Sequence, residues 1–119
     1  MIHLDHRDGR PIYQQILDGF REQIRAGVLM EGDRMPSVRE LATQLAINPN
    51  TIQRAYRELE FQGWIASVAG KGSFVCGVPQ SDAQELLQAF DKLTTTLLSM
   101  GIPARELAAR IEKGGEDHA

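Results

Sequence analysis

One segment of the chain carries side chains that can read the edges of nucleic-acid bases. Asn50, Gln53, Arg54 and Arg57 supply amide and guanidinium groups there. In the major groove of DNA, arginine can form two hydrogen bonds with guanine, and asparagine or glutamine can form two with adenine. Around a helix, all four side chains lie between about 100° and 200° from the apolar Ile52. The spacing therefore predicts a helix face capable of base recognition, and a solvated face is the alternative.

The other side of this helix is apolar. If that side is buried in the core, the polar side faces solvent. Asn48 suits the N-cap, Pro49 suits the first helical turn, and Gly63 is expected to end the helix. Apolar side chains recur on the buried side, at Ile52, Ala55, Tyr56 and Leu59. The sequence thus predicts a helix between Pro49 and Gly63 that is packed along one side.

A shorter helix is predicted just before it. Ser37 and Glu40 have the spacing of a capping box, in which each side chain bonds the backbone N–H of the other residue. Apolar residues share one face of this helix, at Val38, Leu41, Ala42 and Leu45. Only a few residues around Ala46 and Ile47 separate the two helices, so the pair is a candidate helix-turn-helix.

An amphipathic helix is also expected near the start of the chain. Apolar residues recur every four positions beside Tyr13 and Leu17, at Ile12, Ile16, Phe20 and Ile24. This period is typical of the buried stripe of a helix. The helix is expected to run from about Pro11 to about Ala26, with Gly27 as its left-handed terminator and a turn at residues 31–33.

A glycine-rich hairpin is predicted after the two short helices. Its strands are expected at residues 64–68 and 73–76, around a tip that contains Gly70, Lys71 and Gly72. Glycine lets the backbone approach a groove of DNA closely, and lysine supplies a cation for a phosphate or the minor groove. A plain hairpin turn with a solubilising lysine is the alternative.

The last part of the chain carries an apolar seam. Apolar residues follow one another at spacings of 4, 3, 4 and 3, at Leu86, Phe90, Leu93, Leu97 and Met100. Such spacing is typical of coiled coils, and a single helix cannot bury it, so we expect a homodimer through residues 81–113. A final helix is expected to begin at Pro103 and to end at Gly114–Gly115.

The chain is therefore expected to have three parts. Residues 1–76 are predicted to form a compact domain, residues 77–80 a linker, and residues 81–119 a helical dimerisation tail. Ser81 and Gln84 have the spacing of a capping box at the start of the tail. The predicted fold class is mainly α with a small β-hairpin.

Net charge leaves a nucleic-acid partner open. The 119 residues carry a formal charge of −3, but residues 1–76 hold nine basic and nine acidic side chains, whereas residues 77–119 hold four and seven. DNA binding would then depend on where the basic side chains point. No apolar run approaches the ~18 residues that span a bilayer, and no signal peptide is apparent, so a cytoplasmic location is expected.

Catalytic and metal chemistry receive little support from the sequence. Cys76 is the single cysteine, and the histidines lie far from it, at His3, His6 and His118. A nucleophilic cysteine needs a base within hydrogen-bond reach, so Cys76 is interpreted as a strand residue. His3 and His6, with Asp5 between them, are a weak candidate for metal chelation. We expect no enzyme, no cofactor and no metal.

Aromatic residues in the first 76 positions have two interpretations. Their helical and alternating spacing predicts core positions for Tyr13, Phe20, Tyr56, Phe61, Trp64 and Phe74. A stacking platform for single-stranded nucleic acid is the alternative. The helical pattern favours the core.

Four segments together resemble the winged-helix domain of the GntR family over residues 10–76. They are Pro11–Ile16, Gly32–Ala42, Asn48–Leu59 and Gly70–Val75. The resemblance implies a dimeric bacterial regulator whose third helix enters the major groove and whose wing reaches the adjacent minor groove. Only 43 residues follow Cys76. This short tail resembles the YtrA subfamily, whose members often lie beside transporter genes that they repress.

The resemblance adds residues to the candidate interface. It implies a base or phosphate contact for Arg39, and backbone-phosphate contacts for Asn48 and Thr51. The predicted DNA-binding set is Arg39, Asn48, Asn50, Thr51, Gln53, Arg54, Arg57, Gly70, Lys71 and Gly72. Pro49 and Ala69 depart from the family, because some relatives have arginine at the first position and a basic or imidazole side chain at the second. The operator is therefore expected to differ from theirs.

The expected function is sequence-specific binding of double-stranded operator DNA, an inverted repeat, by a dimeric regulator that represses a nearby operon. No membrane partner is expected, and the sequence leaves any effector ligand open. The alternative is a winged helix that serves protein interaction or DNA architecture without reading sequence. An acidic or apolar face on the third helix would favour that alternative, and the face here is basic and rich in amides.

Overall fold

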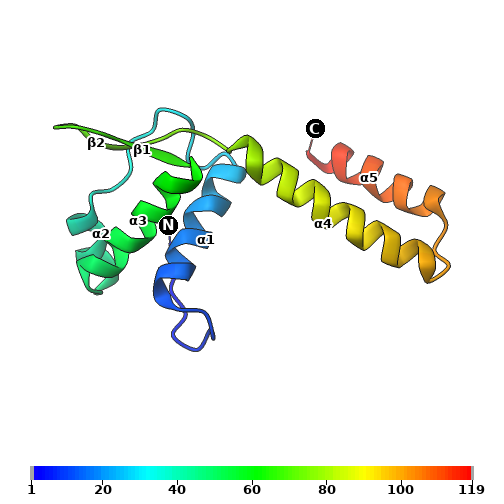
Figure 1. Ribbon diagram of the computed structural model, residues 1–119, viewed down its shortest axis with the longest axis horizontal. Helices are drawn as coiled ribbons and strands as arrows, with labels where there is room; N and C mark the ends of the chain where they lie inside the picture. Colours follow the sequence, from blue (N-terminus) through cyan, green and yellow to red (C-terminus); the bar gives the residue numbers. More distant parts are fainter. Residues whose placement is uncertain (1, 119) are drawn as a thin grey trace. The chain divides into compact units, whose positions relative to one another are not determined.

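The computed structural model describes residues 2–118, with side chains described for residues 2–114. The elements, in chain order, are α1 (Ile12–Arg25), α2 (Val38–Leu45), α3 (Pro49–Gln62), β1 (Ile65–Val68), β2 (Gly72–Val75), α4 (Gln80–Ser99) and α5 (Ala104–His118) (Figure 1). They form two compact units, Met1–Pro79 and Gln80–Ala119. The predicted fold class, mainly α with a small hairpin, is confirmed.

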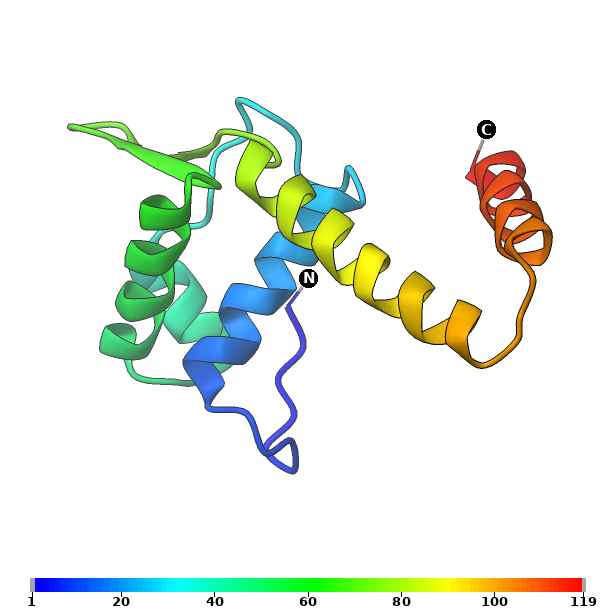
Figure 2. The ribbon, with the colours of Figure 1, turned by 45° about the vertical axis from the view of Figure 1, so that its right-hand side comes forward.

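The first unit is built on α1 and α3, which lie side by side with α2 against α3 (Figure 2). All three helices and both strands contribute side chains to one core, among them Ile16, Leu41, Ile52, Ile65 and Val75. α1 ends close to the predicted position: Ala26 is its C-cap, and the next residue, Gly27, has a left-handed φ of 77°.

The N-terminal arm is tied to α1 by a buried glutamine. Gln15 accepts a hydrogen bond from the Asp5 backbone N–H at 2.8 Å and donates from Nε2 to the Asp5 and Arg10 carbonyl oxygens. Among the described residues, no three His, Cys, Asp or Glu side chains gather as metal ligands would. The structure therefore gives no support to chelation by His3 and His6.

The hairpin pairs β1 and β2 antiparallel, with Ile65 opposite Val75 and Val68 opposite Gly72. The strands are shifted by about one residue from the predicted ranges, a usual error at strand ends. Residues before α2 pair with the outer edge of β2: the Met35 N–H donates to the Ser73 carbonyl at 2.8 Å, beside a single bridge between Arg34 and Phe74. The wing is therefore anchored to the helix-turn-helix through this loop.

Three of the six aromatic residues predicted to be buried are buried. Phe20, Tyr56 and Trp64 belong to the core, and the Phe20 and Tyr56 rings meet edge to face at a centroid distance of 5.8 Å. Tyr13 and Phe74 are half-buried. The prediction was wrong for Phe61, which is 86% exposed, because it lies about 180° around α3 from the buried Ile52.

The tail consists of two helices joined by a turn at Gly101. α4 begins at Gln80, so Ser81 lies in the first helical turn and is not the predicted N-cap. α5 continues to His118 and does not end at Gly114–Gly115. Gly114 does not adopt the left-handed conformation that ends many helices. A glycine inside a helix lowers stability by only about 1 kcal/mol relative to alanine. No helix of the described residues is both long and apolar enough to cross a membrane.

Candidate nucleic-acid interface

Local capping sets the helix-turn-helix geometry. Ser37 Oγ accepts a hydrogen bond from the Glu40 backbone N–H at 3.0 Å, which confirms one half of the predicted capping box. α2 ends where Ala46 takes a left-handed φ of 56°. Asn48 Oδ1 then accepts from the Asn50 N–H at 2.8 Å, with Pro49 as the first residue of α3, as predicted. The turn between α2 and α3 is therefore held by backbone conformation and caps.

Tyr56 anchors the entrance of α2 to α3. Its hydroxyl donates to the Pro36 carbonyl oxygen at 2.7 Å from within the core. Burial, helped by the negative charge of Glu40, raises the pKa of the Tyr56 phenol well above its usual value. The phenol therefore resists deprotonation, which keeps its proton available for this hydrogen bond.

Replacing Tyr56 by phenylalanine is expected to lower the free energy of unfolding by about 1 kcal/mol, because the Pro36 carbonyl loses its buried donor. Urea denaturation followed by circular dichroism measures the change. Tyr13→Phe is the matched control, since among the described residues the Tyr13 hydroxyl has no hydrogen bond. Equal losses in the two variants would contradict the anchoring role of Tyr56.

The exposed face of α3 carries most of the side chains predicted to read bases. Asn50, Gln53 and Arg57 are exposed, on the side away from Ile52, Ala55, Tyr56 and Leu59, which are buried as predicted. Within residues 2–114, no acidic side chain forms an ion pair with Arg57. The structure thus presents amide and guanidinium groups to a partner along the N-terminal three turns of α3.

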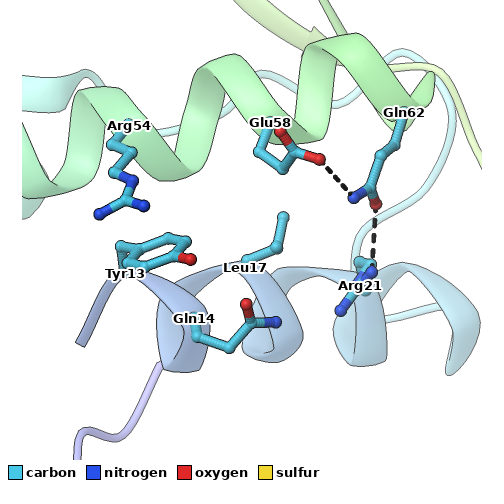
Figure 3. A pocket seen from close by; sticks show the side chains of 7 residues that line it. All are labelled: Tyr13, Gln14, Leu17, Arg21, Arg54, Glu58 and Gln62. Atoms are coloured by element: carbon cyan, nitrogen blue, oxygen red, sulfur yellow. Dashed lines mark hydrogen bonds between the residues drawn. The ribbon is translucent and has the colours of Figure 1, made fainter. Parts of the chain in front are cut away.

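Arg54 departs from the rest of this face. Its guanidinium lies over the ring of Tyr13 from α1, with its central carbon 3.6 Å from the ring centroid (Figure 3). Arg54 is exposed, as its helical position predicts, but its guanidinium leans towards the boundary between α1 and α3. Its role in base recognition stays a prediction.

The residues added by the family resemblance lie beside this face. Arg39 is exposed on α2 and forms no ion pair with the described acidic side chains, so the alternative of a surface ion pair has no support. Thr51 is half-buried in the first turn of α3. Asn48 uses its amide oxygen as the N-cap, which leaves the amide N–H groups as the donors that a phosphate would require.

The wing tip has the backbone that its glycines predict. Gly70 and Gly72 have φ values of 76° and 105°, which side chains with a Cβ rarely adopt. The Lys71 N–H closes the turn onto the Val68 carbonyl at 2.9 Å, and the lysine side chain is exposed. A cation is therefore presented at the tip of the hairpin.

Arg34 also lies at the wing, although it is absent from the predicted DNA-binding set. A Cβ on Gly72 would lie 3.4 Å from Arg34 Nε, so the guanidinium runs along the hairpin at its glycine. Pairing of this loop with β2 brings Arg34 there, and no local pattern reveals a pairing across about forty intervening residues. A second exposed cation thus accompanies Lys71.

Two acidic side chains of α3 form hydrogen bonds within the fold. Glu60 accepts hydrogen bonds from the Ser67 N–H and hydroxyl, both at 3.2 Å. Glu58 accepts from Gln62 Nε2 at 2.9 Å. These bonds hold the two carboxylates against neighbouring groups of the protein.

The apolar seam of the tail is largely uncovered in the single chain. Leu86, Phe90, Leu93 and Met100 are 53%, 45%, 64% and 70% exposed, whereas Leu97 is half-buried. Four of these side chains lie on α4 and Met100 directly follows it, and such a row of exposed apolar side chains leaves a surface that a partner would bury.

Comparison with known proteins identifies the fold. Residues 12–75, more than half of the chain, match the family described as bacterial regulatory proteins, gntR family. The chain belongs to the GntR family. This GntR-family protein is 45% identical over 75 residues to the HTH-type transcriptional repressor YtrA of Bacillus subtilis (strain 168). The alignment covers 63% of this chain and 58% of YtrA, so the match spans less than two thirds of that relative.

Solved structures of similar fold agree with this assignment. A transcriptional regulator from Oenococcus oeni has a TM-score of 0.72 and 32% identity, over 95% of this chain and 98% of that chain. AraR(DBD) in complex with operator ORE1 has a TM-score of 0.55 and 29% identity, over 64% of this chain and 93% of that chain. The predicted family, its winged-helix fold and the likeness to YtrA are confirmed.

Proposed function

We propose that this GntR-family protein is a cytoplasmic transcriptional repressor that binds operator DNA as a homodimer. The observation that carries the proposal is the exposed face of α3, where Asn50, Gln53 and Arg57 follow one another beside a cationic wing. Side chains of these types discriminate base pairs in the major groove. The name of the relative YtrA, a transcriptional repressor, and the operator complex of AraR(DBD) support the same function.

In this proposal α3 lies in the major groove and the wing contacts the adjacent minor groove or backbone. Gln53 and Asn50 read base edges, Arg39 and Arg57 contact bases or phosphates, and Lys71 binds a phosphate or the minor groove. The exposed apolar Phe61 lies near the C-terminal end of α3, away from these side chains in the sequence. The composition of the N-terminal turns therefore favours DNA reading over the protein-interaction alternative.

The tail would supply the dimer, and the dimer would set the operator symmetry. An uncovered heptad-like seam on α4 supports pairing between two copies of the chain. A two-fold symmetric protein binds a two-fold symmetric site, so the operator is proposed to be an inverted repeat. The family resemblance makes a nearby transporter operon the first target to examine.

Selection of duplexes from a random-sequence library, followed by titration at several salt concentrations, tests this function. Enrichment of an inverted repeat is expected, with binding that weakens steeply as salt rises despite the acidic pI of about 5.6. For each tenfold rise in salt concentration, the base-10 logarithm of the affinity should fall by roughly 0.9 per phosphate neutralised. The reason is that protein cations displace condensed counterions from the DNA. A flat salt dependence, or failure to enrich any sequence, would contradict the proposal.

A further inference from the structure

The contact between Arg54 and Tyr13 joins the proposed reading helix to α1. The Arg54 guanidinium lies 3.6 Å from the Tyr13 ring centroid, on the face of the ring. Stacking of this kind holds a long, flexible side chain in one plane before any partner arrives. An arginine that reads guanine must instead reach into the groove with its end towards the base edge.

The positive charge of Arg54 is available to bind an anionic partner. Figure 3 places Arg54 at one end of the cleft between α1 and α3, opposite Tyr13, with Glu58 farther along α3. Glu58 accepts its hydrogen bond from Gln62, whose amide oxygen accepts in turn from Arg21. Within residues 2–114, Arg54 forms no ion pair with an acidic side chain.

An open notch lies beside the stacked pair. It has a volume of about 330 Å³ and is lined by Pro11, Ile12, Tyr13, Asn50, Thr51 and Arg54. None of these lining residues is acidic, and Arg54 is the one that carries a charge. The notch also borders the first turn of α3, where Asn50 and Thr51 lie in the proposed DNA contact. An anionic group on the DNA therefore fits this position better than a base edge.

We propose that Tyr13 positions Arg54 to bind a phosphate of the DNA backbone at this notch, so that Arg54 adds affinity without reading sequence. The proposal rests on the proposed DNA-binding function and makes α1 part of the DNA interface. Phosphate contacts fix the register of a protein on the duplex, and base contacts select the sequence. Arg54 then anchors α3 while Gln53 reads.

A double-mutant cycle on the full chain tests the positioning role. Affinities for the selected operator and for random duplex are measured at one salt concentration, for wild type, Tyr13→Leu, Arg54→Ala and the double variant. Arg54→Ala is expected to weaken both DNAs equally, by about tenfold, and to lower the salt slope by about 1 per subunit. Tyr13→Leu is expected to weaken both by about two- to fivefold, and to add no loss once Arg54 is absent.

Two further variants separate the possible outcomes. Tyr13→Phe keeps the aromatic ring, so its affinities are expected to match those of the wild type, unlike those of Tyr13→Leu. Circular dichroism checks that each variant is folded. The proposal would be overturned if Arg54→Ala lowered affinity for the operator but not for random duplex. It would also be overturned if Tyr13→Leu lowered affinity by the same factor whether or not Arg54 is present. Failure of Tyr13→Phe to restore binding would overturn it as well. Gln53→Ala should still lower affinity for the operator more than affinity for random duplex. If it does not, or if the wild-type protein binds no duplex, the proposed DNA-reading function is itself wrong.

Discussion

Replacing Leu93 and Leu97 by aspartate is expected to convert the protein from a dimer into a monomer. Both residues belong to the uncovered seam of α4, and Leu93 is 64% exposed in the single chain. In the proposed dimer the two carboxylates would be buried against a partner helix, where an unpaired charge costs several kcal/mol. Sedimentation at micromolar concentration measures the change. Operator affinity should fall with it, by about 10²-fold or more, because the two half-sites are no longer bound together.

The matched control adds two charges on the other side of the same helix. Gln88 and Thr95 are exposed and lie outside the heptad-like seam, so the double change Gln88→Asp and Thr95→Asp should leave the dimer intact. Thermal denaturation shows that the first unit stays folded in both variants. A wild-type protein that sediments as a monomer at this concentration, or a Leu93→Asp, Leu97→Asp variant that remains dimeric, would rule out the seam as the interface.

Gln53→Ala is expected to lower operator affinity by about 1–3 kcal/mol, with a smaller loss on random duplex. Gln53 is exposed on the second turn of α3, and its amide can both donate to and accept from an adenine edge. Losing this pair of hydrogen bonds removes discrimination between base pairs. The ratio of the two affinities at a fixed salt concentration is therefore the quantity to measure.

Lys71→Ala supplies the contrast, because a lysine on a hairpin tip acts as a point charge. Its loss should weaken operator and random duplex by similar factors and lower the salt slope by about 1 per subunit. Gln88→Ala, which removes the same amide from the exposed surface of α4, is the control that should change neither affinity. A Gln53→Ala protein with unchanged affinity and unchanged selectivity would show that α3 is not the reading element.

Much of the first unit was predictable because its signals are local. Apolar residues at helical spacing located α1, α2 and α3, and the N-caps at Ser37 and Asn48 located the starts of two of them. A capping residue lies within three positions of the N–H group that it serves, so sequence order alone brings the two together. The same reasoning predicted the exposure of Gln53 and Arg57, since burial of one helix side exposes the other.

Local signals failed at the ends of the tail helices. Gly114 and Ser81 are residue types that end or begin helices, but each is also tolerated within one, and in this chain both lie inside helices. Phe61 was predicted to be buried from the spacing of the aromatic residues as a group, although its own position, about 180° around α3 from Ile52, places it on the exposed side. Helical position decided the outcome, since the core contacts only one side of α3.

The sequence by itself determined the family, the winged-helix fold and the amide and guanidinium face of α3. Only the tertiary structure decided which groups the charged ends of the long arginine side chains contact. Arg34 reaches the wing because its loop pairs with β2, and Arg54 turns onto Tyr13 because α1 packs against α3. A helical wheel gives the direction of a Cβ atom, whereas an arginine carries its charge several bonds farther out. Which neighbour that charge meets depends on the packing of segments that are distant in the sequence.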